Sequence, residues 1–234
     1  MWVTDDLAPR GVLRAAIDLG NPVLAQGTAE APSGVTVDLA RDLAERLGVR
    51  LETRCFEAAK DSFAALRDGD AEIGFLAIDP VREADVAFTS PYAVIEDVYA
   101  VPTSSRIADA AEVDRPEARI GVKDGSAYDL HLTRAVEAAT LVRGQEGATV
   151  AAQQGLEVAA GIRVPLTEWA GGAGWRILEP AFMQIRQAVA VRRGHDPATL
   201  AFLVDWIEAR KADGFVAEAL ARSGRRDALV APPA

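Results

Sequence analysis

The feature that most constrains the fold of this chain is a regular alternation of short apolar strands with amphipathic helices. The stretch 71–78 (AEIGFLAI) is almost entirely apolar, as is typical of a parallel strand covered on both faces. An earlier strand pattern, 12–19, precedes a helix pattern in which Leu39, Leu43 and Leu47 line one face. The same alternation continues through most of the chain. It predicts an α/β fold with a largely parallel sheet.

The other expected elements follow the same periodicities. Further strands are expected over 49–56, 119–123, 141–143, 156–161, 175–178 and 187–192. Helices are expected over 61–68, 126–138, 149–154 and 164–170, from 197 to about 214, and from there to about 223.

Several single residues predict where helices begin and end. Thr36 and Asp196 are expected as N-caps, and Asp79 before Pro80 predicts a further helix start. Gly48 stands where a left-handed C-terminal cap belongs. The glycine-rich run 171–174 is expected to be a loop. The tail, 230–234, is expected to be loose.

Two crossing strands, near 97–102 and 187–192, separate the middle of the chain from its two ends. The prediction is a discontinuous first lobe, 1–98 plus 192–234, with a second lobe, 99–191, inserted into it. Each lobe would hold a mixed sheet flanked by helices, and two strands would form the hinge. Such an arrangement predicts a central ligand cleft.

Composition excludes several classes of protein. The formal net charge of −10 argues against nucleic-acid binding. One cysteine, Cys55, excludes an internal disulfide, and two histidines make a histidine-based metal site improbable. No apolar run approaches the roughly 20 residues of a spanning helix. We therefore expect no cofactor, no metal and no membrane span.

Several stretches together carry a family resemblance. They are GVLRAAI (11–17), GVTVDLA (34–40), LRDGDAEI (66–73), DPVR (79–82), VAFTSPY (86–92), IGVKDGS (120–126) and KADG (211–214). In this order and spacing, the chain resembles the solute-binding proteins of ABC importers, family 3, although it diverges from the standard amino-acid binders. The resemblance implies the two-lobe type II periplasmic-binding-protein fold. It also implies a small anionic or zwitterionic ligand and an ABC permease as partner.

The resemblance assigns Arg82 as the main ligand residue, because an Arg six positions before the Phe of this motif grips a carboxylate. A guanidinium binds a carboxylate through two parallel hydrogen bonds. The alternative is a solvated Arg paired with Asp79. Gly125 and Ser126 match a helix start whose N–H groups and hydroxyl hold an anionic group, and the alternative for Ser126 is an ordinary N-cap.

Three weaker candidates complete the first lobe. The resemblance implies that Ala77 offers its carbonyl oxygen. Asp79 stands where the family often has Thr, and a plain N-cap is its alternative. Asn21 is a further hydrogen-bonding candidate, with a turn residue as the alternative.

One departure from the family bears on the ligand. The acid that pairs with an α-ammonium in the family's amino-acid binders is absent, and Arg163 stands near its place. An Arg there favours a second acidic group on the ligand, or a ligand that lacks an ammonium. The alternative is an Arg that points to solvent.

Function remains open between classes. The resemblance favours a monomeric binding protein that delivers a carboxylate-bearing molecule, amino acid-like or an organic acid, to an importer. One alternative is an enzyme like cyclohexadienyl dehydratase, for which Glu157, Glu168, Asp79 and Lys60 are available. The other is a cytoplasmic small-molecule sensor. The resemblance implies a periplasmic location, whereas the start at Met1 shows no signal peptide and would imply the cytoplasm if it is native.

Overall fold

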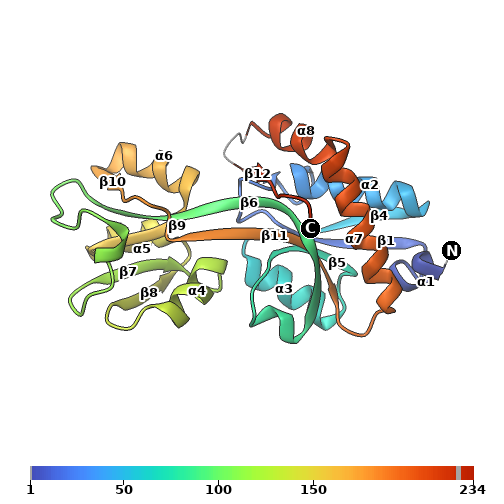
Figure 1. Ribbon diagram of the computed structural model, residues 1–234, viewed down its shortest axis with the longest axis horizontal. Coiled ribbons are helices and arrows are strands. Elements are labelled where there is room, and N and C mark those ends of the chain that lie inside the picture. Colours follow the sequence, from blue (N-terminus) through green and yellow to red (C-terminus); the bar gives the residue numbers. More distant parts are fainter. Residues whose placement is uncertain (1, 225–227) are drawn as a thin grey trace. The chain divides into compact units, whose positions relative to one another are not determined.

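The computed structural model describes residues 2–224 and 228–234 and separates into two compact units. The first consists of 1–94 and 186–234, and the second of 95–185. The boundaries fall inside β6 (Val86–Pro102) and β11 (Met183–Arg192), so each of these strands begins in one unit and ends in the other (Figure 1).

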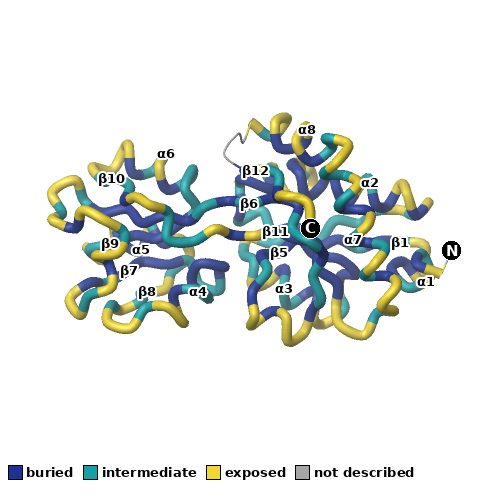
Figure 2. The backbone as a smooth tube through the Cα atoms, viewed as in Figure 1, coloured by how far each residue is buried: buried dark blue, intermediate teal, exposed yellow. Residues whose placement is uncertain are grey.

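The first unit is built on parallel strands β4 (Arg50–Phe56), β1 (Val12–Asp18) and β5 (Ile73–Ala77), in that order. Strand β11 adds to β5 in the antiparallel sense. All five residues of β5 are buried, as expected for a strand covered on both faces. Figure 2 shows this strand in the colour of buried residues.

The helices of this unit end and begin much as their sequences predict. They are α1 (Trp2–Leu7), α2 (Val35–Leu47), α3 (Ala59–Asp68), α7 (Pro197–Ala212), α8 (Phe215–Arg222) and the 3₁₀ turn η1 (Arg82–Ala84). Gly48 and Gly69 are left-handed C-caps, the conformation in which glycine has no steric penalty. Asp196 caps α7 through a hydrogen bond from Ala198 N–H of 2.9 Å.

The second unit has the parallel strands β9 (Val158–Ile162), β7 (Arg119–Lys123) and β8 (Thr140–Gly144). The second-unit part of β6 pairs antiparallel with β9 and with β10 (Trp175–Ile177). Helices α4 (Ala127–Ala135), α5 (Gly147–Gln154) and α6 (Arg163–Ala173) complete it, with the 3₁₀ turn η2 (Ala110–Glu112).

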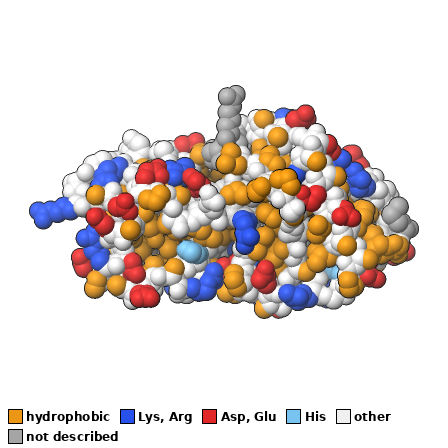
Figure 3. Space-filling model, viewed as in Figure 1, with side chains coloured by type: hydrophobic (Ala, Val, Ile, Leu, Met, Phe, Trp, Pro, Cys, Tyr) orange, Lys and Arg blue, Asp and Glu red, His pale blue; other side chains and the backbone are white. Residues whose placement is uncertain are grey.

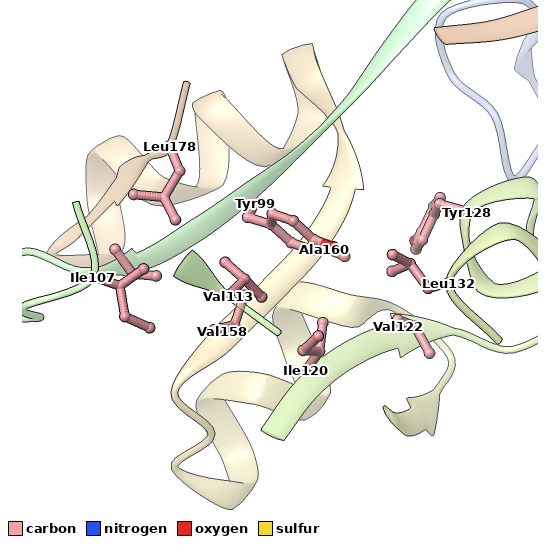
Figure 4. Close-up of a cluster of buried hydrophobic side chains, with 11 residues drawn as sticks. Tyr99, Ile107, Val113, Ile120, Val122, Tyr128, Leu132, Val158, Ala160 and Leu178 are labelled. Atoms are coloured by element: carbon pink, nitrogen blue, oxygen red, sulfur yellow. The ribbon is translucent and has the colours of Figure 1, made fainter. Parts of the chain in front are cut away.

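An apolar cluster covers one face of the second unit's sheet. It joins Tyr99 of β6, Ile120 of β7 and Ala160 of β9 to Tyr128 and Leu132 of α4 (Figure 4). Residues on the opposite face, which include Val98 and Ala100, join a second cluster with α5 and α6. Alternate residues of β6 therefore face different helices, as the two-residue period of a strand requires.

The structure corrects four local predictions. Thr36 does not cap α2, since Gly34 holds that position and the Thr36 hydroxyl donates to Leu24 O at 3.3 Å. The Asp79–Pro80 start leads only to η1. Gly171 and Gly172 lie inside α6, because Leu166 and Ala170 pack the helix on the sheet.

The fourth correction concerns the tail. Leu229 and Val230 form β12, which pairs antiparallel with Ala93 and Val94 of β6. Other elements were not predicted at all: α1, the turn η2, and the hairpin of β2 (Gln26–Gly27) with β3 (Pro32–Ser33). Among the described residues, no helix has the length and apolar character needed to cross a membrane.

Candidate functional site

The predicted ligand residues of the first unit gather at one edge of its sheet. Strands β1 and β5 are parallel neighbours, so their carboxyl ends meet at the same edge. Asp18 ends β1 and Asn21 follows it. Ala77 ends β5, and Asp79 and η1 follow. The fold thus brings Asn21, Ala77 and Arg82 to one edge.

Arg82 is held in place by this edge. Its side chain is buried, with 2% exposure, and its Nη1 donates to the carbonyl oxygen of Ala77 at 3.1 Å. Burial lowers the pKa of the guanidinium, and the nearby carboxylates of Asp79 and Asp18 act in the opposite direction. A guanidinium stays charged even when buried. The edge therefore presents a fixed cation that two acids balance.

Asp79 and Asn21 have local structural roles as well. Asp79 Oδ1 accepts a hydrogen bond from Val81 N–H at 2.8 Å, which is the capping role offered as its alternative. Asn21 Oδ1 accepts from Val23 N–H at 3.3 Å, so its side chain also stabilises a turn. These bonds do not use the amide nitrogen of Asn21, which is its donor group.

In the second unit, the predicted site lies at the start of α4, just after the carboxyl end of β7. Ser126 is the N-cap, and its hydroxyl accepts a hydrogen bond from Asp129 N–H at 3.1 Å. Gly125 has φ of +70°, a left-handed conformation that suits glycine. The sequence prediction of a helix start at this point is confirmed.

The backbone donors of this turn are engaged within the unit. Gly125 N–H donates to Asp129 Oδ2 at 2.9 Å, and Ser126 N–H donates to Lys123 O at 3.1 Å. The Asp129 carboxylate is also paired with Arg143, whose Nε lies at 3.1 Å. The Ser126 hydroxyl also forms a hydrogen bond with the Tyr128 hydroxyl, which acts to lower the pKa of Tyr128 against the larger, opposing effect of burial.

Arg163 is paired with two carboxylates of its own unit. Its Nε donates to Glu96 at 2.7 Å, and its Nη1 and Nη2 donate to Glu179 at 2.6 and 2.9 Å. Glu179, and then Glu96, raise the pKa of Arg163 against the opposing effect of burial. A ligand carboxylate would have to displace one of these bonds. The role of Arg163 in reading a second acidic group stays a prediction, and these pairs weigh against it.

Three polar residues that sequence reasoning did not single out belong to these edges. Asp18 is close enough to Arg82 and to Tyr92 to act on the pKa of both. The Tyr92 hydroxyl is buried and has no hydrogen-bond partner among the described residues. Asp97 of β6 is likewise buried in the second unit with both carboxylate oxygens unpartnered in the described part of the chain.

The sequence contains part of the evidence that would single out Asp97. Asp97 is an acid two positions before Tyr99 and four before Val101, both buried on one face of β6. Such an acid within a buried strand pattern is unusual enough to be marked as a site candidate. Its burial depends on long-range packing, so the sequence alone did not show it.

The surface in Figure 3 carries interspersed acidic and basic side chains on the face shown. Among the described residues, no group of three or more His, Cys, Asp or Glu side chains has a geometry suited to a metal ion. The chemistry available at the two edges is thus recognition of charged and hydrogen-bonding groups by Arg, Ser and acid side chains.

Solved structures identify the class of fold. A putative ABC-transporter binding component from Wolinella succinogenes, complexed with lysine, is 22% identical, with a TM-score of 0.76 over 91% of this chain and 95% of that one. A solute receptor for L-cysteine from Neisseria gonorrhoeae is 22% identical, with a TM-score of 0.78 over 95% and 93%. The fold is that of the periplasmic binding proteins.

The same fold also occurs outside transport. A histidine kinase sensor domain with similarity to periplasmic binding proteins is 20% identical, with a TM-score of 0.79 over 94% of this chain and 98% of that one. At such identities these likenesses establish the fold alone. No curated protein matches the sequence.

The family is established by a match of its own. Residues 13–224 match the model of the bacterial extracellular solute-binding proteins, family 3. This range covers most of the 234 residues. The chain belongs to this family and is a solute-binding protein.

Proposed function

We propose that this protein binds a small carboxylate-bearing molecule of the amino-acid type and delivers it to an ABC importer outside the cytoplasm. The observation that carries the proposal is the position of the Arg82 guanidinium. This guanidinium is buried at the carboxyl ends of two parallel strands, oriented by its bond to the Ala77 carbonyl. Ligands of α/β sheets bind preferentially at such strand ends.

The chemistry of this edge favours a carboxylate. The planar fork of Arg82 matches the two oxygens of that group, and low exposure strengthens the interaction. Ser126 of the second unit is a further proposed contact, through its hydroxyl, while Asn21 and Asp79 remain secondary candidates. Proteins of similar fold are named as a lysine complex, a receptor for L-cysteine and an arginine-binding protein bound to glutamine, so amino acids are the first molecules to test.

The ligand class is tested by thermal unfolding of the wild-type protein with L-lysine, L-arginine, L-glutamine, L-cysteine and a set of dicarboxylates. A ligand at 100 times its Kd stabilises the native state by about 2.7 kcal/mol. Calorimetry then gives the affinity for whichever compound shifts the transition most.

The role of Arg82 is tested with Arg82→Ala and Arg82→Lys. Loss of one member of a buried charge pair costs about 2–5 kcal/mol of binding free energy, and Lys lacks the planar fork. Arg67→Ala is the matched control, because Arg67 is an exposed residue of the same unit paired with its neighbour Asp68. An unchanged affinity of Arg82→Ala for the compound that the wild type binds would refute the proposal.

The transport role needs a separate measurement. Deletion of the gene from its host should abolish high-affinity uptake of the radiolabelled ligand, and expression of the wild-type protein should restore it. Normal uptake in the deletion strain would refute the importer role while leaving the binding role intact. Size-exclusion chromatography with light scattering tests the expectation of a monomer.

A further inference from the structure

Arg163 joins three separate segments of the second unit. It is the first residue of α6, and its Nε donates to Glu96 of β6 at 2.7 Å. Its Nη1 and Nη2 donate to the two carboxylate oxygens of Glu179 at 2.6 and 2.9 Å, and Glu179 lies in the segment that leads from β10 into β11. One guanidinium therefore ties both places where the chain crosses between the units to the start of α6. These three residues are called the Arg163 cluster.

The first unit holds the crossing strands as far as the boundary between the units. That boundary falls between Val94 and Ile95 on β6, and between Ile185 and Arg186 on β11. Strand β12 pairs with β6 as far as Val94. On β11, the carbonyl oxygen of Arg186 accepts a hydrogen bond from Ile78 N–H at 2.9 Å, and the pairing with β5 begins at the next residue. The bonds of the first unit thus reach 94 and 186.

The bonds of the second unit begin close to the same boundary. Glu96 belongs to the Arg163 cluster, and the carbonyl oxygen of Asp97 accepts from Phe182 N–H at 3.1 Å. Ile95 on β6 and the segment 183–185 on β11 lie between the two sets of bonds. A bend of the backbone in these short segments would leave both sets intact, which is what a hinge requires.

The chemistry of the Arg163 cluster favours a mechanical role over a ligand contact. One positive charge faces two negative charges, and the guanidinium already engages three N–H donors. A ligand carboxylate would therefore meet a group of net negative charge. An isolated ion pair at the surface contributes little to stability, whereas a bidentate arginine pair within a network holds its members in a fixed geometry.

A second arginine–glutamate pair in the same unit provides a matched comparison. Arg119 of β7 donates through Nε and Nη2 to Glu157 at 3.0 and 2.8 Å. Glu157 directly precedes β9, so this pair links two strands that lie wholly within the second unit. The Arg163 cluster, in contrast, holds the segments that cross between the units. A difference between the two pairs would therefore report on the hinge and not on ion pairing in general.

We propose that the Arg163 cluster is a conformational clamp that fixes the second-unit end of the hinge. The inference rests on the proposed function, because the clamp affects binding only where a ligand moves one unit against the other. Loss of the cluster lets Glu96 and the segment 179–182 move with the hinge, so the ligand-free protein samples more conformations. A ligand must then order more of the chain and binds more weakly. Arg163 acts on affinity without touching the ligand.

The central test measures the movement of the units without any ligand. Nitroxide labels are attached to Glu45→Cys of α2 and Gln153→Cys of α5, both exposed positions, in a Cys55→Ser background. Double electron–electron resonance gives the distribution of distances between the labels. Arg163→Ala should broaden this distribution, and Arg119→Ala should leave it as in the wild type. A wild-type distribution in Arg163→Ala, or equal broadening in Arg119→Ala, overturns the proposal.

A second variant covers the case that Arg163→Ala does not fold. Glu96→Ala combined with Glu179→Ala removes both acceptors at positions that are 39% and 64% exposed, and it should broaden the distribution in the same way. Raising NaCl from 0.1 to 1 M shortens the Debye length from about 10 to about 3 Å. The wild-type distribution should therefore broaden with salt, and that of the double variant should not. A double variant with the narrow wild-type distribution overturns the proposal.

Binding measurements separate a clamp from a ligand contact. Calorimetry compares the wild type, Arg163→Ala and Arg119→Ala with each amino acid and dicarboxylate that the wild type binds. Arg163→Ala should weaken every ligand about fivefold, the low end of energetic coupling between distant groups, and Arg119→Ala should weaken none. A loss confined to ligands with two acidic groups would assign Arg163 to the ligand and overturn the clamp. If the wild type binds none of the compounds, the proposed function fails, while the label distances still decide whether the cluster restrains the hinge.

Discussion

The carboxylate of Asp129 accepts a hydrogen bond of 2.9 Å from the backbone N–H of Gly125, while the N–H of Asp129 donates to the Ser126 hydroxyl at 3.1 Å. These reciprocal bonds fix the turn before α4. Asp129 is buried, and Arg143 balances its charge. Asp129 therefore positions Ser126 without needing to touch a ligand itself.

The first prediction is that Asp129→Ala weakens both the fold and ligand binding. Removal of this buried acceptor leaves Gly125 N–H without its partner and Arg143 without its carboxylate, at a cost of about 1–3 kcal/mol in the free energy of unfolding. Asp114→Ala is the control, because Asp114 accepts backbone N–H groups of Glu137, Ala138 and Ala139 beyond the carboxyl end of α4. It should lower stability and leave affinity unchanged. Equal losses of affinity in both variants would contradict the positioning role.

The second prediction concerns pH. Burial raises the pKa of Asp97 in the folded protein, so between the unfolded value, about 3.9, and the folded value only the native state binds the proton. Over that window the free energy of unfolding falls as pH rises, by about 1.4 kcal/mol per pH unit for this group. Asp97→Asn removes this decrease. The free energy of unfolding of Asp97→Asn minus that of the wild type should therefore be larger at pH 7 than at pH 4. Denaturant unfolding of both proteins at both pH values measures this difference.

A pH-independent difference between Asp97→Asn and the wild type would contradict the second prediction. Ligand-free protein is used, so that the difference reports the titration of Asp97 alone.

The third prediction concerns the carboxyl-terminal tail. Lys211 Nζ donates to Glu208 at 2.7 Å, to Pro232 O at 2.9 Å and to Pro91 O at 3.2 Å. Glu208 also accepts from the Ser90 hydroxyl. Lys211→Met keeps the aliphatic stem but removes the donor to Pro91 O and Pro232 O and leaves Glu208 without its cationic partner. It should lower the free energy of unfolding by about 1–3 kcal/mol.

Proteolysis gives a second measure of that prediction. Loss of the Pro232 contact should increase cleavage of the tail after β12 in Lys211→Met, while Lys60→Met, a change on α3, should leave the tail protected. Wild-type stability together with wild-type protection would show that Lys211 does not hold the tail.

Local patterns accounted for much of the fold. The strand 119–123 was predicted with the bounds that the structure gives it, because its centre is apolar and Asp124–Gly125–Ser126 ends it. The Gly48 cap was also confirmed, since a left-handed residue after a helix is a local property. The pairing of β12 with β6 was missed, because it joins residues more than 130 positions apart.

The residues of the candidate site also divide into those that local patterns predict and those that depend on long-range contacts. Sequence reasoning selected Arg82 and Ser126 from motifs, and both lie after the carboxyl ends of parallel strands. The two glutamates around Arg163 could not be predicted, because Glu96 and Glu179 belong to other elements. Asp97 was missed because burial without a partner depends on the register of β6 against β9 and on α4.

The last prediction contrasts two glycines of the second unit. A Cβ at Gly147 would lie 2.4 Å from Ala160 O and 2.7 Å from Gly121 O, which are backbone atoms that cannot move aside. Gly147→Ala should therefore lower the free energy of unfolding by about 1–3 kcal/mol. Gly171 lies inside α6, and a Cβ there would meet nothing within 4 Å. Gly171→Ala should raise the free energy of unfolding by about 0.5–1 kcal/mol, because glycine loses more backbone entropy in a helix than alanine. Denaturant unfolding of both variants checks the pair, and a destabilised Gly171→Ala would show that 171–173 is a loop after all.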